Sequence, residues 1–82
     1  MRIPDINRLY KCEELLKRVH DNLYKVLENM HKQKQDDTNA YAEIQNYRKD
    51  VDHMIFWLSG TARKAREDVP EEQWKKYNNK LL

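Results

Sequence analysis

The sequence predicts an all-α protein: an antiparallel hairpin of two long helices, followed by a short C-terminal helix. Apolar residues recur at alternating spacings of three and four in two separate stretches, which is the period of an α-helix. A purely polar segment lies between the stretches and leaves room for one reversal of the chain. The 82 residues include one glycine and two prolines, so the turns of an all-β fold are missing. A chain of this length forms a single domain, 1–82.

The first long helix is expected over residues 5–34. Pro4 is tolerated at a helix start, and Asp5 favours the positive end of the helix dipole. Acids precede bases by four residues along this segment, for example Glu13 before Lys17 and Glu28 before Lys32, which supports a helix with a solvated outer face. Its apolar stripe, expected to face the second helix, consists of Leu9, Cys12, Leu16, Val19, Leu23, Val26 and Met30.

The second long helix is expected over residues 38–67, after a loop without apolar residues, with Asp37 or Thr38 as its N-cap. Gly60 leaves two alternatives. It could end the helix as a C-cap residue, or the helix could continue past it at a cost of about 1 kcal/mol relative to alanine. We favour continuation, because it makes the two helices equal in length. The stripe of this helix consists of Ala40, Ile44, Tyr47, Val51, Met54 and Leu58, extended by Ala62, Ala65 and Val69.

A third, short helix is expected over residues 70–81. Asp68 can cap it, Pro70 suits its first turn, and Glu71 occupies the capping-box position. Trp74, Tyr77 and Leu81 would share one of its sides.

The chain carries more apolar residues than one contact line between two helices can bury. Residues 54–58 make the second helix apolar nearly all the way round. One interpretation is a core closed by the third helix. The other is an interface with a second copy or with a partner's helix, because aromatic residues commonly anchor such contacts. The candidate partner-binding residues are Tyr41, Ile55, Phe56, Trp57 and Trp74.

Residue patterns typical of enzymes, metal sites and cofactor sites are absent from the sequence. A single glycine excludes a glycine-rich phosphate loop, and no paired cysteines, His-Glu-x-x-His motif or carboxylate-rich calcium loop is present. Cys12 falls in the first stripe and is expected to be a small buried apolar residue. We therefore expect a non-enzymatic protein with no catalytic residues, no cofactor, no metal and no small-molecule substrate.

The strongest basic cluster is Arg63, Lys64 and Arg66 in the second helix. It could contact phosphates or an acidic protein, or it could simply be a solvated surface. The net charge of +2 is nearly balanced, so a nucleic-acid-binding helical protein is the alternative function and not the leading one. The single cysteine, and the absence of a signal peptide or membrane-spanning run, favour a cytoplasmic location.

The opening residues Met-Arg-Ile-Pro-Asp-Ile-Asn, the chain length and the glycine-poor helical character rich in Lys, Glu and Tyr resemble small early proteins of T-even bacteriophages. Among these, the whole chain is similar to the cytoplasmic lysis-inhibition accessory proteins, which are antiholins. The resemblance implies a regulator in the host cytoplasm. It would bind the cytoplasmic N-terminal segment of a holin and so delay pore formation. The resemblance assigns no individual binding residues.

Overall fold

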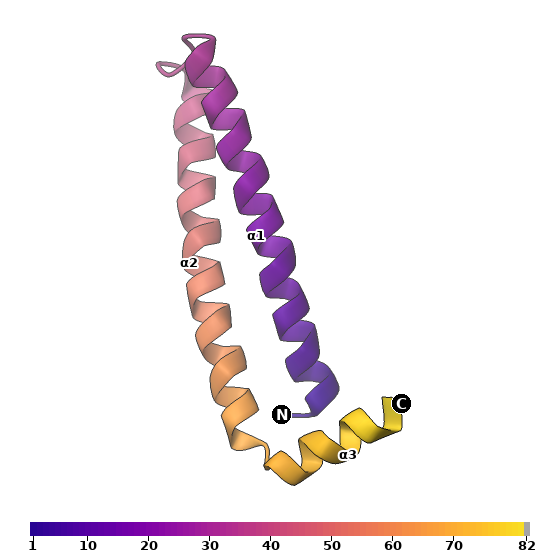
Figure 1. Cartoon of the computed structure of the whole chain (residues 1–82). Coiled ribbons are helices and arrows are strands. Elements are labelled where there is room, and N and C mark those ends of the chain that lie inside the picture. The colour runs from indigo at the N-terminus through magenta and orange to yellow at the C-terminus, as the bar shows by residue number, and fades with distance from the viewer. Residues whose placement is uncertain (82) are drawn as a thin grey trace.

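The computed structural model describes residues 1–81 and confirms the all-α helical hairpin (Figure 1). Helix α1 spans Ile3–Lys32, α2 spans Asn39–Asp68 and α3 spans Glu71–Leu81. The two 30-residue helices run antiparallel and pack along their length, while α3 turns back beneath the start of α1 (Figure 1). The side chain of Leu81, expected beside Trp74 and Tyr77, lies outside the described residues.

The helix ends follow local chemistry and lie within two residues of the expected positions. Helix α1 begins before Pro4, because the Arg2 carbonyl already accepts bonds from the N–H groups of Asp5 (3.0 Å) and Ile6 (3.1 Å). It ends at Lys32, and Lys34 reverses the chain in the left-handed region at φ 58°. Of the two expected caps for α2, the structure uses Thr38, whose Oγ1 accepts a bond from the Tyr41 N–H at 3.2 Å.

Helix α2 continues through Gly60, the alternative that we favoured from the sequence. Its backbone has an ordinary helical conformation, so nothing in the local geometry requires glycine. A Cβ atom added at Gly60 would meet no other atom within 4 Å.

Gly60→Ala is therefore expected to stabilise the protein by about 1 kcal/mol, the difference in helix propensity between the two residues. Urea denaturation followed by far-UV circular dichroism would measure this change in unfolding free energy. The chain has no second glycine to serve as a matched control. Asn46→Ala, at an exposed position inside the same helix, serves instead and should raise stability by a smaller amount. A lower free energy of unfolding for Gly60→Ala would contradict the conclusion that a side chain at position 60 has free space around it.

The contact line between α1 and α2 differs from the predicted stripes, and this corrects the expected packing. In α1, Cys12, Val19 and Val26 are exposed, whereas their neighbours Glu13, His20 and Leu27 turn inward. The expectation that Cys12 is buried was wrong. The same one-residue displacement occurs in α2, where Tyr41, Arg48 and Ile55 turn inward in place of Ala40, Tyr47 and Met54. The remaining stripe positions, such as Leu16 and Leu58, stay half-buried beside the contact line.

Most of the described residues that are fully enclosed gather at the end of the hairpin where α3 crosses. Ile6 is 0% exposed, and Ile3, Ala62 and Ala65 are also buried there. Helix α3 contributes the half-buried Trp74 and Tyr77 to this end. The Arg66 guanidinium of α2 lies 5.0 Å from the centre of the Trp74 ring, a distance suited to a cation–π contact. The third helix thus closes one end of the hairpin and leaves its long sides uncovered.

The molecule is a single layer of helices. Its Cα atoms extend over 55 × 23 × 12 Å, so the thinnest dimension is that of one helix. Among residues 1–81, none of the helices has a stretch long and apolar enough to cross a lipid bilayer.

Candidate partner-binding groove beside Phe56 and Trp57

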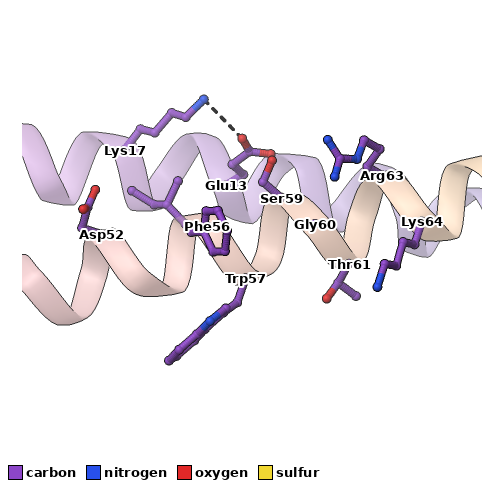
Figure 2. Close-up of a pocket in the computed structure, with 11 residues that line it drawn as sticks. Glu13, Lys17, Asp52, Phe56, Trp57, Ser59, Gly60, Thr61, Arg63 and Lys64 are labelled. Atoms are coloured by element: carbon purple, nitrogen blue, oxygen red, sulfur yellow. Dashed lines mark ion pairs between the residues drawn. The ribbon is translucent and has the colours of Figure 1, made fainter.

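Two aromatic side chains of α2 lie open to solvent near the middle of the hairpin. Phe56 is 76% exposed and Trp57 is 65% exposed. Consecutive residues leave a helix about 100° apart, so the two rings point in different directions. Figure 2 shows Phe56 over the space between the helices and Trp57 directed away from α1. The Trp57 ring is supported one turn back by His53, with ring centres 5.7 Å apart.

Phe56 and Trp57 border an open groove of about 660 Å³ that both long helices line (Figure 2). The half-buried Ile55 belongs to the same lining. Ser59 and Gly60 follow on α2, and the surface at Gly60 is open, since a Cβ atom added there would meet no atom within 4 Å. The groove therefore combines a large exposed ring with a stretch of helix that another backbone can approach closely.

Charged residues occupy the edges of the groove. Glu13 and Lys17 of α1 form an ion pair at 3.2 Å on one edge. Arg63 and Lys64 stand toward one end and Asp52 toward the other (Figure 2). An apolar centre with charged edges is the arrangement that suits an amphipathic helix, whose apolar residues enter the groove while its polar residues meet the rim.

The structure brings together three of the five candidate partner-binding residues, namely Ile55, Phe56 and Trp57. Tyr41 lies near the loop end, in a separate hollow that it shares with Tyr24 and Arg48. Trp74 lies on α3, where it is half-buried and contacts Arg66. The candidate residues thus do not form one continuous site.

The basic cluster is divided by the geometry of α2. Arg63 and Lys64 line the groove from different directions (Figure 2), whereas Arg66 is engaged with the Trp74 ring. The three cations therefore do not present one flat basic face, as repeated phosphate contacts would need.

Sequence reasoning missed the contribution of α1 to the groove. It assigned Glu13 and Lys17 to a solvated face, although Glu13 is half-buried against α2. Their spacing indicates the ion pair, but it does not indicate that the pair borders a neighbouring helix. Asp52 and Ser59 belong to no motif, and no signal in the sequence could have placed them at the groove.

The polar groups elsewhere form small local contacts. His20 lies between Asp21, at 3.7 Å, and Asp52, at 4.0 Å, and His31 is hydrogen-bonded to Asp36 at the loop. Within residues 1–81, no three His, Cys, Asp or Glu side chains are grouped closely enough to hold a metal ion.

Comparison with protein-family models, with curated protein sequences and with solved structures found no match to this chain.

Proposed function

We propose that this chain is a non-enzymatic interaction module that binds a helical segment of a partner protein in the groove beside Phe56. The observation that supports the proposal most directly is the exposure of Phe56 and Trp57 at the border of one open groove. Covering a large apolar side chain contributes about 1.5–3 kcal/mol, so two exposed rings offer a partner a substantial part of its affinity.

The lining of the groove supports a proposal for the chemistry of the partner segment. The segment would be an amphipathic helix whose apolar residues cover Phe56 and Ile55. An acidic residue at its end would lie near Arg63 and Lys64, where it adds specificity and speeds association. A small residue opposite Gly60 would let the two helices come close.

The resemblance to the antiholins of T-even phages supplies a specific partner for this proposal. The segment would be the cytoplasmic N-terminal region of a holin, which is short and amphipathic. Holding that region in the host cytoplasm would keep the holin from assembling into pores and would delay lysis.

The test is a binding titration of the protein with a labelled peptide that carries a T-even holin's cytoplasmic N-terminal segment. Phe56→Ser combined with Trp57→Ser is expected to weaken binding by about 100-fold or more, because both exposed anchors are removed. Far-UV circular dichroism should stay unchanged, since neither ring is enclosed by its own chain.

Tyr24→Ser is the matched control, because Tyr24 is an aromatic residue with similar exposure, 57%, that lies outside the groove. It should bind the peptide as the unaltered protein does. Peptide binding that survives the double substitution would contradict the groove as the site. Loss of helicity in the double variant would show that the two rings belong to the core.

A further inference from the structure

The two long sides of the hairpin differ sharply in polarity. The side that bears the groove carries charged residues such as Glu13, Lys17 and Arg63. On the opposite side, an almost entirely apolar hollow is lined by Leu16, Met54, Trp57, Leu58 and Thr61. We call this opposite surface the apolar side.

Helical periodicity extends the apolar side along both helices, because residues three, four or seven positions apart share a helix face. It consists of Cys12, Leu16, Val19, Leu23, Val26 and Met30 on α1, with Tyr47, Val51, Met54 and Leu58 on α2. All of them belong to the two stripes predicted from the sequence. The exposed members are Cys12, Val19, Val26, Tyr47 and Met54, and the others are half-buried beside the contact line. The one charged residue that shares this face between Tyr47 and Met54 of α2 is the exposed Asp50, three residues after the first and four before the second.

The described part of the chain leaves this surface open. Tyr47 is 52% exposed and Met54 is 49% exposed, and Val19 and Val26 are exposed as well. Helix α3 crosses the end of the hairpin and does not cover its side (Figure 1). A single layer of helices has no second layer against which to bury an apolar face.

The direction of the stripes specifies what kind of layer is missing. In a two-helix coiled coil, the apolar stripes face each other directly. In a four-helix bundle, each stripe points toward the bundle axis, between its neighbours. Here Leu16 and Leu58 are half-buried beside the contact line while Val19 and Met54 face out, so both stripes point above the plane of the hairpin. That is the geometry of half a four-helix bundle.

We propose that a second copy of this chain packs on the apolar side and completes a four-helix bundle. Each long helix is about 45 Å long and about 10 Å wide, so one side of the hairpin offers roughly 900 Å². A stable interface takes about 800 Å² from each partner. A second hairpin matches this surface in length, width and apolar character, and a two-fold axis lets the same surface serve both copies.

This dimer is independent of the proposed function. The groove beside Phe56 lies on the other side of the hairpin and stays open, so a dimer would present two grooves facing outward. Trp57 lines both the groove and the hollow of the apolar side. It is therefore not substituted in the test of the dimer.

The test compares two tyrosines of nearly equal exposure on opposite sides of the hairpin, by sedimentation velocity over a wide range of protein concentration. The unaltered protein is expected to sediment as a dimer. Tyr47→Glu should raise the dissociation constant by about 100-fold or more, because a carboxylate would be buried between the layers. Tyr24→Glu places the same change on the groove side and should leave the dimer intact.

A second measurement covers the case in which Tyr47→Glu fails to fold. If folding and assembly are coupled, the thermal midpoint of the unaltered protein must rise with its concentration. A monomer at every concentration, or a species larger than a dimer, would overturn the proposal. Equal disruption by Tyr24→Glu and Tyr47→Glu would overturn it as well.

Discussion

Ile6→Ala is expected to lower the free energy of unfolding by about 2–5 kcal/mol, the range for removing a buried aliphatic side chain. Ile6 is 0% exposed and lies where α1 begins, α2 ends and α3 crosses. A chain this small has a limited core, so the loss would consume a large share of its stability. Urea denaturation followed by circular dichroism would measure the change.

The control for this prediction is Phe56→Ala, which removes a larger side chain from an exposed position. We expect it to change the unfolding free energy by no more than about 0.5 kcal/mol. Equal losses of unfolding free energy in Ile6→Ala and Phe56→Ala would contradict the conclusion that Ile6 is enclosed in the core while Phe56 is exposed at the groove.

Trp74→Ala is expected to destabilise the protein by about 2–3 kcal/mol, because it removes a large aromatic side chain that is partly buried at the end of the hairpin. The change also removes the contact with Arg66 and separates α3 from the end of the hairpin. Thermal unfolding, monitored by circular dichroism, would show a lower midpoint. Trp57→Ala should leave the thermal midpoint of the monomer nearly unchanged, because most of the Trp57 side chain is exposed to solvent.

Trp74→Phe separates the apolar contribution of this residue from its polar one. The Trp74 Nε1–H is buried without a hydrogen-bond partner among the described residues, so its removal costs no bond. Phenylalanine should therefore keep most of the stability that alanine loses. A phenylalanine variant as unstable as the alanine variant would mean that the indole N–H is required.

The helices were predictable because their signals are local. A 3–4 spacing of apolar residues, a capping threonine at Thr38 and prolines beside the starts of α1 and α3 act within a few residues of the chain. Continuation through Gly60 was also predictable, since the stripe resumes at Ala62 and one glycine costs little in a packed helix.

The packing of the helices was predictable only in part. Periodicity shows that Leu16 and Val19 share a face, but it does not show whether that face meets the neighbouring helix or a further layer. Glu13 and His20 turn inward although both are polar, because half-burial lets their polar ends reach solvent at the edge of a single layer. Among the candidate site residues, the sequence identified Phe56 and Trp57 as surplus apolar residues. It could not distinguish them from Trp74, which is half-buried and contacts Arg66.

The amino-acid sequence by itself determined three helices, their ends and the excess of apolar side chains, because each depends on residues close together in the chain. The tertiary structure alone decided which side chains meet across α1 and α2, and it placed the groove and the apolar side on opposite faces. Those features depend on the rotation of each helix about its own axis. That rotation is set by all the contacts of the folded chain together, and no local pattern specifies it.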